Sequence, residues 1–190
     1  MAKITIGLTG GIASGKSVAS EILRLFGAEI IDADIVSRQV GQGEIAQAFP
    51  DCTTDGALDR RKLRKVVFGD ERKLKLLNSI THPLIVAEIL RKRDEVNGVA
   101  VIVAPLLLEV GLHKYCDKVI TVTAQADTRI KRIVERDNIT ESLAYNMIEA
   151  QASDEARIAI ADYVVQNDGT EDELRGRLKE WWSQNIENVY

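Results

Sequence analysis

One stretch near the start of the chain decides the fold: Gly7-Leu8-Thr9-Gly10-Gly11-Ile12-Ala13-Ser14-Gly15-Lys16-Ser17. From Gly10 onward it fits the pattern G-x-x-x-x-G-K-[ST], whose glycines let backbone N–H groups face a chain of phosphates. The apolar residues 3–9 before the loop predict a buried strand, and the residues after it follow helical spacing. Because the motif requires a strand, a loop and a helix in this order, the sequence predicts a phosphate-binding loop rather than an ordinary glycine turn.

Each residue type in this loop has a chemical task. Lys16 reaches the outer phosphates of a nucleotide, the Ser17 hydroxyl binds Mg²⁺, and the start of the helix adds partial positive charge. We therefore expect ATP and Mg²⁺ as ligands. The residues expected to hold the nucleotide are Gly11, Ile12, Ala13, Ser14, Gly15, Lys16 and Ser17.

Strands and helices alternate along the rest of the chain. Residues 28–31, 99–104, 118–123 and 162–166 predict strands, and residues 17–26, 126–136, 141–160 and 171–186 predict helices. Residues 35–98 show no clear strand and read as a helical insertion, with Pro83 in the first turn of one helix. We expect Trp181 and Trp182 to serve packing. The alternation predicts an α/β fold with a parallel sheet and helices on both faces.

Composition excludes several classes of protein. The chain has 190 residues, of which 45% are hydrophobic and 28% charged, so disorder is excluded as the main state. Its net charge of -4 argues against binding nucleic acid through bulk positive charge. No apolar run approaches the roughly 20 residues of a membrane span or forms a signal-peptide core. Cys52 and Cys116 lack metal-like spacing, and we expect two free thiols in the cytoplasm.

The candidate carboxylates near the phosphates follow the second predicted strand. Residues 99–104 end without an acid, whereas Asp32 and Asp34 follow residues 28–31 at the sheet edge where such folds bind ligands. Two carboxylates there suit two tasks, holding Mg²⁺ through water and accepting the proton of an attacking hydroxyl. The alternative is that Asp32 or Asp34 caps the helix that follows.

Basic residues form the next group of candidates. Arg129, Arg132 and Arg136 have the spacing of one helix face, so they are able to clamp phosphates, and the alternative is a solvent-facing helix surface. Arg157 is a weaker candidate. His82 is equally compatible with a structural histidine and with a substrate contact.

The chain lacks the N-K-x-D segment of a Ras-type GTPase and is too short for a large ATPase, so a small-molecule kinase fits better. Its motifs occur in the order and spacing of a known family: the glycine loop, Ile31-Asp32-Ala33-Asp34 with Arg38, Leu58-Asp59-Arg60 with Leu63, Val67-Phe68, Ile80-Thr81-His82-Pro83, Pro105-Leu106-Leu107 with Glu109, Arg129, Arg136-Asp137, Gln151, and Ala161-Asp162 with Asn167 and Gly169. Along nearly its whole length the chain thus resembles dephospho-coenzyme A kinase.

The resemblance implies the three-layer fold of P-loop kinases, with a five-stranded parallel sheet. It implies one kinase domain over 1–190, with a core at 1–34, 99–125 and 158–190, a substrate-binding insertion at about 35–98 and a lid at about 126–157. It also implies ATP-dependent phosphorylation of the ribose 3'-hydroxyl of dephospho-coenzyme A, the last step of coenzyme A synthesis. The implied partners are these small molecules, without nucleic acid or membrane, and a monomer is the default expectation.

The resemblance further implies the roles of the reacting groups. Asp34, with Asp32 beside it, is the expected base. Lys16 and Arg136 neutralise the charge that develops on the moving phosphoryl group. Ser17 holds Mg²⁺, with Asp32 reaching the ion through a water molecule.

Four further positions are implied to bind the substrates. Asn167 falls near the adenine of ATP, and His82, Arg129 and Leu107 fall on the acceptor side.

The chain departs from the family pattern at a few places. Ala13 stands where the family often has glycine, and its methyl group is tolerable if φ is negative. Val103 replaces a frequent acid, and the segment 41–56 is short. Two rival functions fit the sequence less well. A kinase for a nucleoside monophosphate is disfavoured by the segments 32–34 and 82–83. A regulatory module without phosphate transfer is disfavoured by the retained lysine, serine and aspartate.

Overall fold

The computed structural model describes residues 4–54, 57–151 and 153–187. Lys3, Asp55, Gly56 and Ala152, which fall within ranges discussed above, lie outside the described residues. The chain divides into two compact units, Met1–Ile31 with Glu95–Tyr190, and Asp32–Asp94. Each unit is described by itself.

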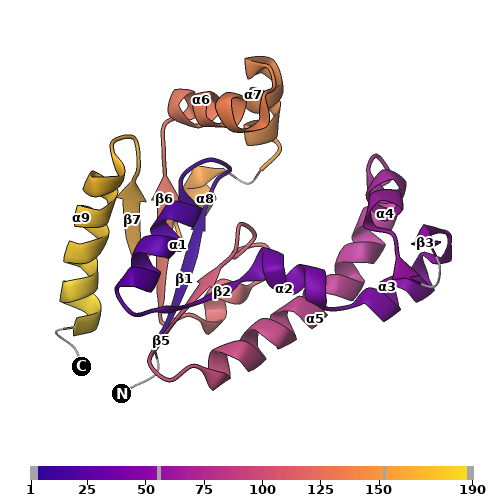
Figure 1. The fold of residues 1–190 in the computed structure, drawn as a ribbon, viewed down its shortest axis with the longest axis horizontal. Coiled ribbons are helices and arrows are strands. Elements are labelled where there is room, and N and C mark those ends of the chain that lie inside the picture. The colour runs from indigo at the N-terminus through magenta and orange to yellow at the C-terminus, as the bar shows by residue number, and fades with distance from the viewer. Residues whose placement is uncertain (1–3, 55–56, 152, 188–190) are drawn as a thin grey trace. The chain divides into compact units, whose positions relative to one another are not determined.

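A single five-stranded sheet organises the first unit (Figure 1). Its strands are β1 (Ile4–Gly10), β2 (Glu29–Asp32), β5 (Val99–Val103), β6 (Lys118–Thr123) and β7 (Tyr163–Gln166), in the order β2-β5-β1-β6-β7. The central strand β1 pairs in parallel with β5 and β6, and β6 pairs in parallel with β7. Every residue of β1 is buried, as expected of a strand covered on both faces. The parallel sheet predicted from the sequence is confirmed.

The helices of this unit follow the strands. They are α1 (Lys16–Leu25), α6 (Ala126–Asp137), α7 (Glu141–Glu149), α8 (Asp154–Ile158) and α9 (Glu171–Trp182), with a 3-10 turn at Leu112–Tyr115 and a π-helical turn at Ser183–Glu187. Helices α1 and α9 pack beside each other on one face of the sheet (Figure 1). Their apolar side chains form the main core with β1, β5, β6 and β7, and this core fixes where the loop before α1 begins.

Both tryptophans belong to this core. Trp181 and Trp182 are almost fully buried, and Trp182 packs against Phe26 with ring centroids 5.8 Å apart. Trp181 stacks on Tyr163 at the same centroid distance of 5.8 Å. The packing role predicted for both residues is confirmed.

The single helix predicted over 141–160 is wrong. Helix α7 ends at Glu149, and α8 begins at Asp154. The break has a local cause, because the Ser153 hydroxyl accepts a hydrogen bond from the amide of Ala156 and so starts a new helix. This break becomes important for the site, because it places Asp154 at the first position of a helix.

The second unit is mostly helical. Its elements are α2 (Ala33–Gln39), α3 (Gln42–Ala48), a 3-10 turn (Pro50–Cys52), β3 (Thr53–Thr54), β4 (Ala57–Leu58), α4 (Arg60–Val67) and α5 (Glu71–Glu95). A small core packs around Ile45, Phe49, Cys52 and Leu63. The expectation of no strand in this segment is wrong, since β3 and β4 form a short antiparallel pair.

Helix α5 runs without interruption through Pro83. The predicted helix start at Pro83 is therefore wrong. A proline here removes the hydrogen bond to the carbonyl of Ser79 and crowds that carbonyl, and the long helical segments on both sides outweigh this cost.

Candidate functional site

The glycine loop lies between β1 and α1, where the sequence predicts it. Gly15 has a φ of 106°, a conformation that favours glycine. A Cβ atom at Gly10 would collide with the carbonyl oxygen of Val122, and one at Gly15 would collide with the side-chain amide of Asn167. The two motif glycines are therefore required by the conformation and the close packing of the loop.

Ala13 does not meet the condition stated for it. Its φ is 58°, in the left-handed region, so the negative φ at which a methyl group is tolerated is not present. The methyl group there costs roughly 1–2 kcal/mol because Cβ approaches the backbone closely in this conformation. The loop thus stores strain at a position where glycine would store none.

Lys16 begins α1 and folds back over the loop. Its Nζ donates to the carbonyl oxygens of Gly10 at 2.7 Å and Gly11 at 2.9 Å. Gly15 caps the helix without a side chain, so no side chain at that position covers the amides of the first turn. The exposed residue Ser17 lies in the same turn. A lysine ammonium and a helix N-terminus therefore meet at one point, which suits a polyanion.

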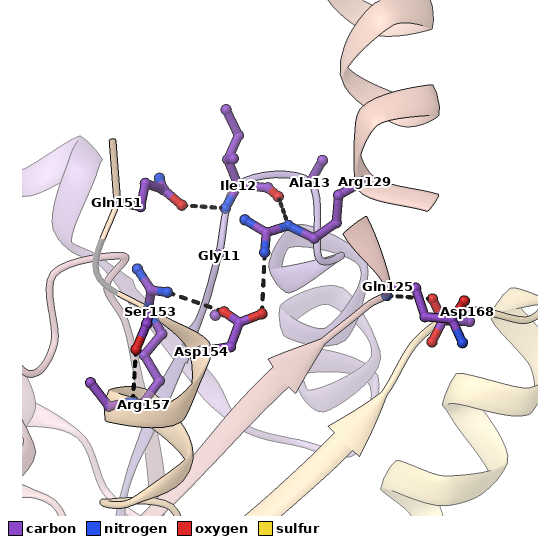
Figure 2. Close-up of polar contacts among 12 residues, drawn as sticks. Gly11, Ile12, Ala13, Gln125, Arg129, Gln151, Ser153, Asp154, Arg157 and Asp168 are labelled. Carbon is purple, nitrogen blue, oxygen red and sulfur yellow. Dashed lines mark hydrogen bonds and ion pairs between the residues drawn. The ribbon is translucent and has the colours of Figure 1, made fainter. Parts of the chain in front are cut away.

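The backbone of Ile12 is held on both sides by residues distant in sequence (Figure 2). The Nε of Arg129, in α6, donates to the carbonyl oxygen of Ile12 at 2.9 Å. The amide of Ile12 donates to Oε1 of Gln151 at 2.7 Å. Arg129 also lies over Gly11, where any Cβ would collide with its guanidinium group.

The next two carbonyls of the loop are held in the same way. Arg132 donates to the carbonyl oxygen of Ala13 at 3.2 Å and to that of Asn167 at 2.9 Å. The buried Asn167 donates through Nδ2 to the carbonyl oxygen of Ser14 at 2.8 Å. With the bond to Ile12, three successive loop carbonyls accept hydrogen bonds from side chains. These contacts restrict the path of the loop.

An acid that sequence reasoning did not single out joins two arginines beside the loop. Asp154 accepts a hydrogen bond from Nη1 of Arg129 at 3.1 Å and from Nη1 of Arg157 at 3.2 Å (Figure 2). Burial lowers the pKa of Arg129, the charge of Asp154 opposes that change, and the charge of Arg157 adds to it. Asp154 stands three residues before Arg157, and this spacing is the only signal in the sequence that suggests their ion pair.

Arg136 differs from the other two arginines of α6. Its side chain is exposed and forms a bidentate pair with the adjacent Asp137, at 2.8 Å and 2.7 Å. The hydrogen bond from this pair raises the pKa of Arg136 and lowers that of Asp137. The alternative to phosphate clamping is that these arginines line a solvent-facing helix surface. That alternative is wrong for the buried Arg129, whereas Arg136 does face solvent in this structure.

Asp32 and Asp34 lie where β2 gives way to α2. Oδ1 of Asp32 accepts hydrogen bonds from the amides of Asp34 at 2.8 Å and Ile35 at 3.2 Å, so Asp32 caps α2. The capping alternative is confirmed for Asp32, whereas the residue Asp34 is exposed. A cap leaves the second oxygen of Asp32 available for another partner.

The two remaining predicted contacts lie in different environments. His82 is half-buried within α5. Leu107 is fully buried, and its methyl groups lie so close to Gly7 of β1 that a Cβ there would collide with them. A substrate contact through Leu107 therefore requires its segment to move.

Asp168 is a second acid that the sequence did not reveal. It follows β7 and accepts a hydrogen bond from the amide of Gln125 at 2.7 Å (Figure 2). It accepts a second hydrogen bond from the side chain of Gln166 at 2.7 Å. Burial alone would raise the pKa of Asp168, but these hydrogen bonds, with Thr128 and the charge of Arg132, lower it overall. Asp168 ties the start of α6 to the end of β7.

The described residues lack a metal-binding cluster and a membrane-spanning helix. Within residues 4–54, 57–151 and 153–187, no group of three or more histidine, cysteine or acidic side chains is placed to hold a metal ion. None of the helices in those ranges is both long and apolar enough to cross a membrane. Neither Cys52 nor Cys116 belongs to a disulfide, and Sγ of Cys116 donates to the carbonyl oxygen of Leu112 at 3.4 Å.

A parallel sheet with a glycine loop between its central strand and the following helix is the arrangement of a P-loop protein. A solved member of that class, shikimate kinase from Acinetobacter baumannii in complex with shikimate, shares the fold with a TM-score of 0.56, 13% identity, and coverage of 98% of this chain and 95% of that one. The sequence profile of the dephospho-CoA kinase family matches residues 4–173. The chain belongs to the dephospho-CoA kinase family, and it is a kinase.

Individual relatives agree with this assignment. The dephospho-CoA kinase of Fusobacterium nucleatum is 38% identical over 184 residues, covering 92% of this chain and 94% of its own. That of Xanthomonas campestris is 41% identical over 185 residues, covering 92% and 89%. The solved dephospho-CoA kinase from Campylobacter jejuni has a TM-score of 0.76 and 25% identity, with full coverage of both chains. The resemblance stated from the sequence is confirmed.

Proposed function

We propose that the glycine loop holds the polyphosphate of ATP and that the chain transfers the γ-phosphoryl group to the ribose 3'-hydroxyl of dephospho-CoA. Family membership supports ATP and dephospho-CoA as the substrates. The observation that carries the site assignment is the position of Lys16, whose ammonium group lies 2.7 Å and 2.9 Å from two loop carbonyls at the start of α1. We also propose a monomer in the cytoplasm, a location that two cysteines outside any disulfide support.

The loop would bind the phosphates through its backbone and Lys16. Loop amides and the N-terminus of α1 supply partial positive charge, and the lysine supplies a full charge. Because the loop is already held by Arg129, Arg132 and Asn167, little ordering cost remains when ATP binds. In this proposal Asn167 lies near the adenine of ATP, and its side chain supports the loop through the hydrogen bond to Ser14.

Mg²⁺ fits the residues present. It prefers oxygen ligands and keeps several waters, so the hydroxyl of the exposed residue Ser17 suffices beside the phosphates, with Asp32 acting through water. A bound Mg²⁺ ion would neutralise part of the negative charge of the phosphates.

Asp34 is the proposed base. Asp32 is engaged in capping α2, whereas the residue Asp34 is exposed. Its carboxylate takes the proton of the 3'-hydroxyl as that oxygen forms a bond to the γ-phosphorus. The bond between this phosphorus and the β,γ-bridging oxygen breaks, and ADP leaves. Lys16 and Arg136 meet the charge of the moving group, for which Arg136 exchanges its present partner Asp137.

The acceptor side is proposed from the family pattern. His82 and Leu107 are the proposed contacts of dephospho-CoA. Arg129 is almost fully buried and bound to the loop, so its part in substrate binding is exerted at the loop.

The test compares turnover and ATP binding in matched variants. We expect the wild type to phosphorylate dephospho-CoA at the 3' position, checked by mass spectrometry and phosphorus NMR of the product. Lys16→Ala should lose at least about 100-fold in kcat/KM because the phosphate charge lacks its partner. Lys179→Ala, which removes an exposed lysine of α9, is the control.

Asp34→Asn should bind ATP normally and lose most turnover, whereas Asp32→Asn should retain more. Near-normal turnover of Lys16→Ala would reject the loop assignment, and near-normal turnover of Asp34→Asn would reject the base.

A further inference from the structure

One carboxylate beside the loop serves two buried cations. The side chains of Arg129 and Arg157 are 6% and 2% exposed, and that of Asp154 is 26% exposed. Each oxygen of Asp154 faces a different guanidinium group, at 3.1 Å and 3.2 Å (Figure 2). Neither the predicted site nor the proposed reaction gives Asp154 a role.

The charges explain why this acid is needed where it lies. Two like charges with little access to water repel each other, and a shared carboxylate offsets that repulsion. Asp154 is the acid that opposes the effects of burial and of Arg157 on the pKa of Arg129. Removing its charge would leave two cations facing each other, and we expect Arg129 to move away from its present position.

The position of Arg129 sets the position of the loop. Its guanidinium group is planar and rigid, so holding Nη1 also fixes the direction of Nε. That Nε donates to the carbonyl oxygen of Ile12 at 2.9 Å, and the group covers Gly11. The chain of contacts therefore runs from Asp154 through Arg129 to the Ile12 peptide.

We propose that Asp154 is a positioning residue for the kinase reaction: by holding the guanidinium group of Arg129, it keeps the Ile12 peptide of the glycine loop in the place that the ATP phosphates require. Asp154 acts only through Arg129, and Arg157 anchors it from the other side. The proposal rests on the proposed role of the loop in binding ATP.

Asp154→Asn tests this role, because it keeps the size of the side chain and removes the charge. We expect the Kd for ATP to rise about tenfold, as for loss of one charge-assisted hydrogen bond, while KM for dephospho-CoA changes less than about twofold. Glu155→Gln is the matched control, since it removes the same charge from an exposed neighbour in α8. An ATP affinity of Asp154→Asn equal to that of Glu155→Gln would overturn the proposal.

Two further variants separate positioning from general stability. Asp154→Glu restores the charge and should recover ATP affinity to within about threefold of wild type. In an Arg129→Lys background, Asp154→Asn should add no further loss, because the group through which it acts is already gone. Full additivity would overturn the proposal. If Asp154→Asn fails to fold, Arg129→Lys alone decides, since normal ATP affinity of that variant contradicts the chain of contacts.

The outcome is separable from that of the proposed function. A wild-type protein that binds ATP, loses that binding on Lys16→Ala and yet does not phosphorylate dephospho-CoA would contradict the reaction only. The ATP titrations of the Asp154 variants would then still decide the positioning role.

Discussion

At the scale of single residues, Ala13 has the most strained backbone of the loop. Among the described non-glycine residues, only Ala13 and Asn138 have a positive φ, of 58° and 52°. Asn138 ends α6, where a left-handed residue is ordinary for a helix C-terminus. Ala13 does not end a helix, and its carbonyl oxygen accepts a hydrogen bond from Arg132. The strain is therefore maintained by the contacts of the loop.

Ala13→Gly should raise the free energy of unfolding by about 0.5–1 kcal/mol. Glycine removes the steric cost of the left-handed conformation, and part of this gain is offset by the greater freedom of glycine in the unfolded chain. Urea denaturation measures the effect. Ala19→Gly, within the buried part of α1, is the control and should lower stability by about 1 kcal/mol or more. A loss of stability in Ala13→Gly would contradict the strain.

Some residues of the site are predictable from neighbouring positions in the sequence, and others are not. Lys16 and Ser17 belong to a contiguous motif, so sequence alone places them correctly at the start of α1. Asp154 acts through a contact with Arg129, twenty-five positions away, and Asp168 through a contact with Gln125. Such contacts depend on how the chain folds over long distances, and no periodicity indicates them.

At the scale of elements, the sequence predicts best what is buried on both faces. The strands β1, β5, β6 and β7 match their apolar runs to within about one residue. Two predicted helix boundaries are wrong. One was missed because the single side chain of Ser153 starts a new helix, and the other was placed at Pro83, where packing keeps the helix continuous through the proline. The pair β3 and β4 was missed because its strands are too short for a visible alternation.

One acid joins two elements and makes their connection depend on pH. Asp168 has a lowered pKa, so its charged form stabilises the folded state. That contribution is complete above the ordinary value of 3.8 and is lost as the pH falls through the lower folded pKa. Asp168→Asn should therefore cost about 1 kcal/mol at neutral pH, an amount moderated by solvent screening, and progressively less below about pH 4.

Urea denaturation of wild type and Asp168→Asn at pH 7, 5, 4 and 3 checks this prediction. Asp172→Asn, at an exposed acid of α9, controls for the loss of one charge. A difference between wild type and Asp168→Asn that stays constant across the range would contradict the role of the carboxylate.

At the scale of the whole molecule, the chain divides into two compact units, and a cluster of buried apolar side chains is described in each. In the described residues, the core of the first unit spans four strands and two helices, whereas that of the second is a small cluster around Phe49 and Leu63. Buried apolar area is the main source of stability, so the second unit should be the less stable of the two.

Two optical signals should separate the unfolding of these units. Both tryptophans lie in α9, so their fluorescence follows the first unit, whereas far-UV circular dichroism also follows α4 and α5 of the second. In urea, the dichroism should begin to fall at a lower concentration than the fluorescence changes. Coincident curves would instead show a single cooperative transition.

The contact between Gly11 and Arg129 has a consequence for how this sequence is able to evolve. A side chain at position 11 is blocked by an arginine that arrives from a distant helix, independently of any nucleotide. Substitutions at the two positions are therefore coupled, because a larger residue at 11 requires the guanidinium group of Arg129 to leave its present contacts or residue 129 to be shorter. In a library randomised at both positions, the active variants should show sizes at 11 and 129 that vary inversely.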